Sequence, residues 1–276
     1  MAGNNKGRLT VLYSVTVVVM LLMIFPFIYL VLQSFAPWDQ VNQRIIPTAL
    51  TLRSWEFLFS GSATSADVPW IGAMFNTFLV ATVSTGLMII TALMVAYALA
   101  KVSFKGKKFV DNFVIFQMFF PGIILLIPQF LIVTKMGWIN TYQGMIVPTA
   151  VSLWAIFMYT NFFKAIPNDI IEAARIDGAK DWTILFKIIL PMSRSITTVI
   201  FLMLYTDRWT TLLWDMIISK DDATITLNVL ISQMFGPYGA YPGPMYAASL
   251  LLTAPIIILF LIFSKQFQKG MDFALK

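Results

Sequence analysis

Residues 68–100 read VPWIGAMFNTFLVATVSTGLMIITALMVAYALA, a stretch of the chain without a single Asp, Glu, Lys or Arg. About 20 consecutive apolar residues cross a bilayer as a helix, so this stretch is long enough to span a membrane. Five further apolar stretches reach a similar length, and they are residues 9–33, 112–134, 136–163, 195–219 and 245–264. One of them, 195–219, is interrupted by Asp207, Arg208 and Asp215. The sequence therefore predicts an all-α membrane protein with six transmembrane helices.

The composition agrees with a membrane protein and narrows its chemistry. Of the 276 residues, 59% are hydrophobic and only 12% are charged, whereas soluble domains average about 25% charged residues. The chain has no Cys and no His, which excludes thiol nucleophiles, disulfides and His-based metal sites. We predict no metal site for this chain.

The distribution of positive charge predicts the orientation of the helices. With six spans, both termini and two loops lie on one side, and these segments carry fourteen Lys and Arg, against four on the opposite side. Basic residues concentrate on the cytoplasmic side of membrane proteins. Both termini are therefore expected in the cytoplasm, and the net charge of +6 reflects membrane orientation rather than a nucleic-acid partner.

Five prolines fall inside the predicted spans. Each removes a helix hydrogen bond and favours a kink unless neighbouring groups compensate. They are Pro26, Pro121, Pro128, Pro148 and Pro255. Ordinary irregularity of membrane helices is the simplest interpretation of these prolines.

The loop before the fifth span, residues 166–191, reads IPNDIIEAARIDGAKDWTILFKIILP. Pro167 suits a first helical turn and Gly178 suits the position that ends a helix. Beyond Gly178, an apolar face recurs at i, i+3, i+4 and i+7, so a second helix is predicted, which Pro191 ends. The residues of that face are Trp182, Leu185, Phe186 and Ile189. The loop therefore predicts an amphipathic helical hairpin at the membrane surface.

The same loop resembles the EAA loop of permeases from ATP-binding-cassette (ABC) importers. That pattern is EAA, three residues, Gly, nine residues, Ile, any residue and Leu-Pro. It is matched here by Glu172, Ala173, Ala174, Gly178, Ile188, Leu190 and Pro191. The resemblance implies a type I ABC importer permease fold, in which this hairpin docks in a groove of the cytoplasmic ATPase and passes on its motion. The implied coupling residues are Glu172, Ala173, Ala174, Asp177 and Gly178. A generic interfacial helix is the alternative.

Further stretches resemble permeases of the carbohydrate, maltose-type family. They are LIPQFLIVTKMGWINTYQGMIVP at 126–148, the ARIDGA within the loop, and the closing segment from Met245. The resemblance covers a core of residues 71–271, and we predict one transmembrane permease domain over 1–276. The chain departs from the family at RWTTLLWDM, residues 208–216, where sugar permeases usually show W-N-x-F-L-W-P. This departure leaves open whether the substrate is a neutral saccharide, an acidic one or another solute.

ATP chemistry is expected on a different chain. The sequence has no GxxxxGK[ST] phosphate loop, so this chain is predicted to bind no cofactor, with ATP and Mg on a partner ATPase. With ATP hydrolysis expected on a partner, we also predict no catalytic residue. The resemblance implies a cytoplasmic ABC ATPase dimer, a second permease and an extracytoplasmic solute-binding protein. For the second permease, a different chain is favoured and a second copy of this one is the alternative. The complex would lie in the cytoplasmic (inner) membrane of a bacterium or archaeon.

Seven polar or aromatic residues in or near the spans are candidates for the translocation pathway. They are Asn76, Gln129, Asp207, Arg208, Trp209, Trp214 and Asn228. Charged groups within spans are costly and usually serve function or pair with each other. Arg208 or Asp207 would face the pathway, or would form a structural ion pair with a neighbouring helix. For the others, interface anchoring and helix–helix hydrogen bonding are the alternatives.

Two other classes of protein compete with an ABC permease. An ion-coupled secondary transporter usually has more spans in repeated halves and intramembrane acids on several helices, whereas charge within the spans here is confined to 195–219. The second class is a non-transporting membrane scaffold. The EAA spacing is typical of ABC-importer permeases and disfavours this class. The sequence therefore favours the permease.

Overall fold

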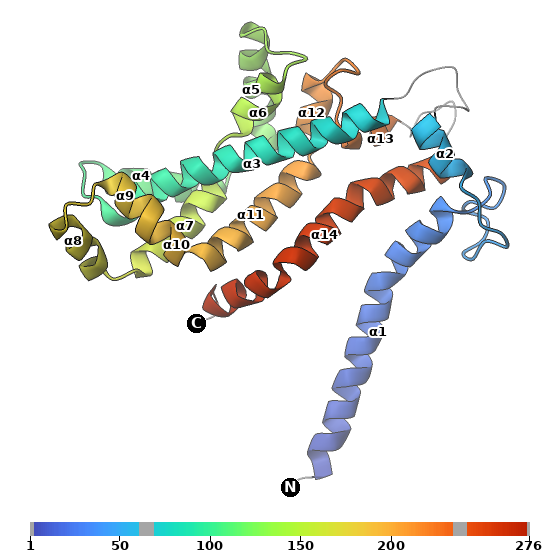
Figure 1. The fold of residues 1–276 in the computed structure, drawn as a ribbon, viewed down its shortest axis with the longest axis horizontal. Helices are drawn as coiled ribbons and strands as arrows, with labels where there is room; N and C mark the ends of the chain where they lie inside the picture. The colour runs from blue at the N-terminus through green and yellow to red at the C-terminus, as the bar shows by residue number, and fades with distance from the viewer. Residues whose placement is uncertain (1–2, 61–68, 234–241, 275–276) are drawn as a thin grey trace. The chain divides into compact units, whose positions relative to one another are not determined.

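Helices form every regular element in the described part of the chain. The computed structural model describes residues 3–60, 69–233 and 242–274. Its elements are α1 Gly3–Ser34, α2 Arg53–Ser60, α3 Trp70–Lys101, α4 Lys107–Met118, α5 Ile123–Lys135, α6 Tyr142–Ile146, η1 Val147–Thr149, α7 Leu153–Ala165, α8 Asn168–Ile176, α9 Asp181–Thr183, η2 Ile184–Ile189, α10 Leu190–Met192, α11 Arg194–Trp209, α12 Leu213–Ile218, α13 Leu227–Gln233 and α14 Pro242–Ala274 (Figure 1). The predicted all-α class is confirmed.

Four helical stretches are long and apolar enough to cross a membrane without interruption. They are Gly7–Ser34, Trp70–Lys101, Tyr142–Ala165 and Pro242–Lys265. Two bent pairs pass the same test of length and composition, one joining α4 to α5 and one joining α9–α10 to α11. Counting each bent pair as one span gives six, in agreement with the sequence.

The predicted continuous helices differ from the structure in three places. The stretch 112–134 bends by 106° between α4 and α5, where Pro121 and Gly122 interrupt the ladder of helix hydrogen bonds. The stretch 136–163 becomes helical only at Tyr142, and Pro148 lies in a short 3-10 turn before α7.

The third difference concerns residues 195–219, where α11 ends at Trp209 and α12 begins at Leu213. Thr210 and Thr211 donate side-chain hydrogen bonds to the carbonyl oxygens of Thr206 and Asp207, at 2.9 Å each. Such bonds compete with the helix ladder. Asp207 and Arg208 therefore lie in the last turn of a helix, rather than in the middle of a span as the sequence predicted.

Contacts divide the chain into two compact units, of which the second contains all the features described below. The first comprises residues 1–70 and 230–254, and the second comprises 71–229 and 255–276. The single domain predicted for residues 1–276 stays a prediction. Within the second unit, one buried cluster joins α3, α7, η2 and α11, and another lies under α3, α5, α6 and α12. These clusters position the helical hairpin of residues 166–191 and the buried side chains around Arg208.

Candidate functional site

The first helix of the hairpin, α8, has well-defined ends. At its start, Lys101 Nζ donates hydrogen bonds to the carbonyl oxygen of Ile166 at 2.5 Å and to Asn168 Oδ1 at 2.8 Å. At its end, Gly178 has φ +79°, a left-handed conformation that favours glycine. The N–H of Ala179 donates to the Ala174 carbonyl at 2.9 Å, and that of Gly178 to the Arg175 carbonyl at 3.0 Å. This pair of bonds is a Schellman motif, as the position of Gly178 predicted.

The hairpin is fastened to the end of α3 by a second set of polar contacts. The Tyr97 hydroxyl donates to Asp181 Oδ1 at 2.7 Å, and Arg175 Nη2 pairs with the same oxygen at 3.2 Å. Tyr97 and Lys101 lie one helical turn apart on α3, and they hold the start of α9 and the start of α8 respectively. A displacement of α8 would therefore be passed to the end of α3.

One face of α8 is turned away from the rest of the unit. Ile171 and Ala174 are buried, at 3% and 8% exposure, whereas Ile176 is 86% exposed. The other predicted coupling residues, Glu172, Ala173, Asp177 and Gly178, are all exposed. The sequence interpretation missed Ile176, although it lies three and four residues beyond Ala173 and Glu172 and so shares their face. This face combines a carboxylate, a small residue and a large apolar residue.

The second helix of the hairpin departs from the predicted single face. Residues Ile184–Ile189 form a π-helix, which shifts the side chains relative to α-helical spacing. Leu185 and Ile189 are buried, but Trp182 and Phe186 are 59% and 38% exposed, with their rings stacked at 5.8 Å. Pro191 does not end the helix, which continues to Met192.

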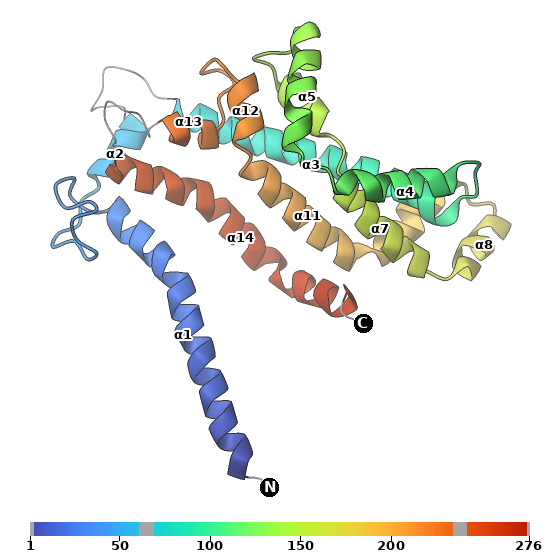
Figure 2. The same ribbon diagram turned by 180° about the vertical axis from the view of Figure 1, so that it is seen from behind.

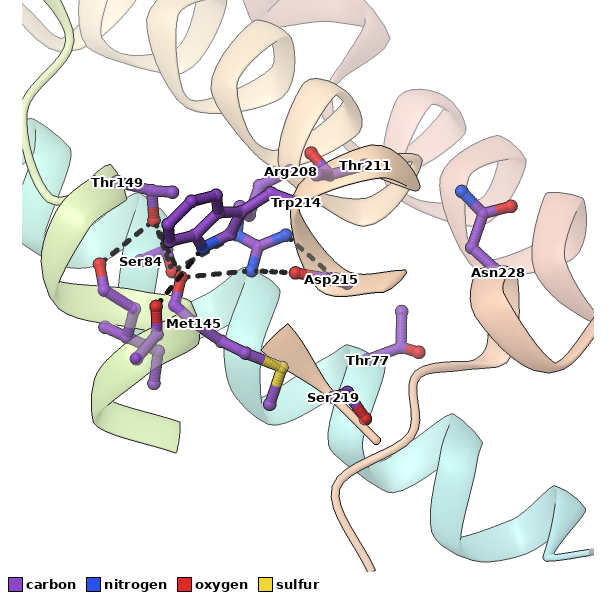
Figure 3. A network of polar contacts seen from close by, with 12 residues as sticks. Thr77, Ser84, Met145, Thr149, Arg208, Thr211, Trp214, Asp215, Ser219 and Asn228 are labelled. Atoms are coloured by element: carbon purple, nitrogen blue, oxygen red, sulfur yellow. Dashed lines mark hydrogen bonds and ion pairs between the residues drawn. The ribbon is translucent and has the colours of Figure 1, made fainter. Parts of the chain in front are cut away.

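Arg208 is the centre of a buried polar network that joins α3, α6, α11 and α12 (Figure 3). Its guanidinium donates to both carboxylate oxygens of Asp215, at 2.7 and 3.1 Å. Further bonds reach the Met145 carbonyl at 3.3 Å and Ser84 Oγ at 3.4 Å. Arg208 and Asp215 are 3% and 2% exposed. Of the two hypotheses for Arg208, this geometry is that of a structural ion pair.

The remaining pathway candidates fall into a buried group and an accessible group. Asn76 is buried and donates to the carbonyl oxygens of Ala223 and Ile225 while accepting from Tyr142. Trp209 and Trp214 are also buried, and Trp214 Nε1 donates to the Gly144 carbonyl at 3.2 Å. The accessible residues are Gln129, Asp207 and Asn228, of which Asn228 donates to the Thr210 carbonyl. The candidates therefore do not form one site.

An open cleft of about 370 Å³ brings together three of the helix breaks. Gly122 comes from the bend between α4 and α5, Thr149 from the 3-10 turn, and Thr211 from the gap between α11 and α12. Gln129 and Trp214 are the two predicted candidates that line the cleft. The sequence interpretation missed Thr149 and Thr211, and the only signal for them was the interruption of the apolar runs. The wall is mainly apolar, with Ile123, Leu126, Leu212 and Leu213, and it carries a few polar groups from Gln129, Thr149 and Thr211 beside the Trp214 indole. Apolar and aromatic walls with a few placed polar groups are typical of small-molecule sites.

Comparisons with known proteins place this geometry in context. The family model described as "Binding-protein-dependent transport system inner membrane component" matches residues 88–273. The arabinooligosaccharide transport permease AraQ of Halalkalibacterium halodurans is 29% identical over 253 residues, 90% of this chain and 89% of the relative. The sulfoquinovosyl glycerol transport permease SmoH of Agrobacterium fabrum is 30% identical over 254 residues, 90% of this chain and 87% of the relative.

The fold also matches a solved structure. A chain of a bacterial ABC transporter involved in the import of the acidic polysaccharide alginate aligns with a TM-score of 0.85. The alignment covers 97% of this chain and 99% of that chain, at 21% sequence identity. The two chains therefore share a fold over the aligned residues.

Proposed function

The chain belongs to the family of binding-protein-dependent transport system inner membrane components, and we propose that it forms half of the translocation pathway for a sugar or oligosaccharide. The family and the type I permease fold expected from the sequence are confirmed by the family match and by the alginate transporter. The chain is a multi-pass membrane protein and a transport subunit, and a solute-binding protein is its partner. Membership of this transport family argues against the two rival classes, an ion-coupled secondary transporter and a non-transporting scaffold.

The sugar assignment rests on the relatives and on the cleft. The relatives are transport permeases for arabinooligosaccharides and sulfoquinovosyl glycerol. The cleft presents the Gln129 amide to a saccharide. The hydroxyl groups of Thr149 and Thr211 donate to backbone carbonyls, so their oxygens act as acceptors for the ligand. Arg208 is engaged by Asp215, so the structure offers no argument from Arg208 for an acidic substrate. A non-sugar solute is the alternative, and ligand identification on the solute-binding protein distinguishes the two.

The face formed by Glu172, Ala173 and Ile176 carries the proposal that this chain couples ATP hydrolysis to transport. The three side chains are exposed on a helix that is held at both ends and fastened to α3. An ABC ATPase dimer, carrying ATP and Mg, would receive this face in a groove, with Glu172 making a charge-assisted contact to a basic group. A second, different permease would complete the pathway, and both termini would be cytoplasmic in the inner membrane.

Reversing the charge at Glu172 is expected to weaken this docking. In Glu172→Lys, the contact is replaced by repulsion, and we expect about tenfold or greater loss of ATPase subunits from the purified complex, since truncating a charged contact commonly costs about 2–5 kcal/mol. The measurement is ATPase stoichiometry after affinity purification of the permease. Asp222→Lys is the matched control, because it makes the same charge change on an exposed residue outside the hairpin. Equal ATPase recovery with Glu172→Lys and the control would rule out docking through this face.

Substitutions in the cleft are expected to raise the KM for uptake. In Gln129→Leu and Thr211→Val, the side chain loses its hydrogen-bonding groups, and each is expected to raise KM about 2- to 10-fold, the equivalent of one neutral hydrogen bond. Thr134→Val is the control, because Thr134 lies on α5 with Gln129 but does not line the cleft. The measurement is ATP-driven uptake as a function of the concentration of ligand-loaded solute-binding protein. An unchanged KM in both cleft variants would place the pathway elsewhere.

A further inference from the structure

One carboxylate oxygen joins the end of α3 to both helices of the hairpin. The Tyr97 hydroxyl on α3 donates to Asp181 Oδ1 at 2.7 Å, and Arg175 Nη2 on α8 donates to the same oxygen at 3.2 Å. Asp181 is the first residue of α9, and α8 lies at the C-terminal end of α3 (Figure 1, Figure 2). These three side chains form a joint between α3 and the hairpin.

The joint is anchored on its α3 side and open on its hairpin side. Tyr97 is 5% exposed and belongs to the buried cluster that joins α3, α7, η2 and α11. The side chains of Arg175 and Asp181 are 46% and 55% exposed. Exposed ion pairs contribute little to the stability of a fold. The hairpin side of the joint is therefore suited to setting a position rather than to holding the fold together.

Open cavities border the joint on two sides. One, of about 310 Å³, has Lys101, Val102 and Arg175 in its lining. The other, of about 210 Å³, has Tyr97, Val102 and Asp181 in its lining. Side chains that line a void lose packing contacts on that side. Hydrogen bonds, rather than close packing, therefore determine where the turn between α8 and α9 lies relative to the end of α3.

The joint and Lys101 act at opposite ends of α8. Lys101 bonds to groups at the start of this helix, whereas Asp181 lies beyond Gly178, after the helix has ended. A helix held at one end transmits only the displacement of that end. Attachment at both ends lets α3 follow a rotation of α8 as well.

We infer that Tyr97 and Asp181 are positioning residues for coupling, and that their hydrogen bond makes α3 follow α8 when the ATPase moves it. The inference rests on the proposed docking of α8 on an ABC ATPase. Neither residue belongs to the docking face formed by Glu172, Ala173 and Ile176. Without the joint, the ATPase stays bound and hydrolyses ATP, but α3 does not complete its movement. Less solute is therefore carried for each ATP hydrolysed.

The test measures the number of solute molecules accumulated per ATP hydrolysed by proteoliposomes that contain the complete importer. The solute-binding protein is loaded with the labelled saccharide that has been identified on it. Tyr97→Phe removes only the hydroxyl group, and we expect this ratio to fall about tenfold, the factor for one hydrogen bond to a charged acceptor. Asp181→Ala should lower the ratio equally, and the double variant no further, because each change removes the same bond.

Two further variants separate coupling from damage to the fold. Asp181→Asn keeps an oxygen that accepts from Tyr97, and we expect it to retain most of the ratio. Tyr159→Phe is the matched control, because Tyr159 lies in the same buried cluster and its hydroxyl has no hydrogen-bond partner among the described residues. We expect this control to keep the ratio of the unmodified protein.

An unchanged ratio in Tyr97→Phe would overturn the inference. A merely structural role of the hydroxyl gives this result, because uptake and ATP hydrolysis then fall in the same proportion. If Glu172→Lys still releases the ATPase, the docking proposal survives that result. Release of the ATPase from Tyr97→Phe would also overturn the inference, because it would place Tyr97 in docking rather than in the transmission of movement.

Discussion

Replacing Gly178 by valine is expected to reduce ATP-driven uptake about 5- to 30-fold while leaving the chain inserted in the membrane. Gly178 has φ +79°, and a side chain in this conformation costs roughly 1–2 kcal/mol, which corresponds to that factor. No atom lies within 4 Å of a Cβ added at Gly178, so the cost comes from the backbone. The Schellman bonds of α8 are lost first, because a helix of nine residues is marginal by itself.

Two further substitutions show whether the conformation of Gly178 is the cause. Asparagine tolerates the left-handed conformation, so Gly178→Asn is expected to retain most of the uptake. Gly137 has φ +69° and equally open surroundings, and Gly137→Val therefore imposes the same strain away from the hairpin. We expect Gly137→Val to keep ATPase subunits bound. Equal uptake by Gly178→Val and the unmodified protein would exclude a coupling role for this turn.

Breaking the ion pair between Arg208 and Asp215 is expected to cost the folded protein about 3–5 kcal/mol, the usual penalty for leaving one charge buried and unpaired. Arg208→Met leaves Asp215 without its two guanidinium hydrogen bonds at 2 to 3% side-chain exposure. It also leaves the Met145 carbonyl without the guanidinium donor. The measurement is thermal unfolding of the purified complex in detergent, where a large drop in Tm is expected.

The double variant Arg208→Met/Asp215→Leu removes both charges and distinguishes a structural pair from a substrate contact. We expect it to recover much of the stability lost by either single variant, since apolar replacement of a buried pair is often close to neutral. If Arg208 instead served the substrate, the double variant would regain no stability and would lose uptake. Strictly additive losses of Tm would contradict direct coupling between the two side chains.

The number of spans was predictable, because a long run of residues without charge has few stable structures other than a membrane-spanning helix. The positions of the bends were not predictable. Pro26, Pro128 and Pro255 lie inside continuous helices, whereas Pro121 and Pro148 lie at breaks. The loss of a hydrogen bond is the same at all five positions. Tertiary packing decides whether the helix continues, and packing is not visible in local sequence.

The ion pair between Arg208 and Asp215 could not be predicted either, because it depends on a helix break. Seven residues rise about 10.5 Å in a continuous helix, so in the predicted span Asp215 is not among the i+3 and i+4 neighbours that pair with Arg208. The gap between α11 and α12 brings them together. The end of α8 was easier to predict, because Gly178 acts through its own backbone conformation and this signal is local in the sequence.

The central claim is that this chain forms part of the transport pathway while partner subunits hydrolyse ATP. ATP-driven uptake by proteoliposomes that contain the complete importer tests this claim most directly. With solute-binding protein and a labelled saccharide on one side, and ATP with Mg on the other, we expect accumulation that stops when ATP is withheld. Imposed proton or sodium gradients should have no effect on this accumulation. Accumulation driven by an ion gradient in the absence of ATP would contradict the assignment of this chain as an ABC importer permease.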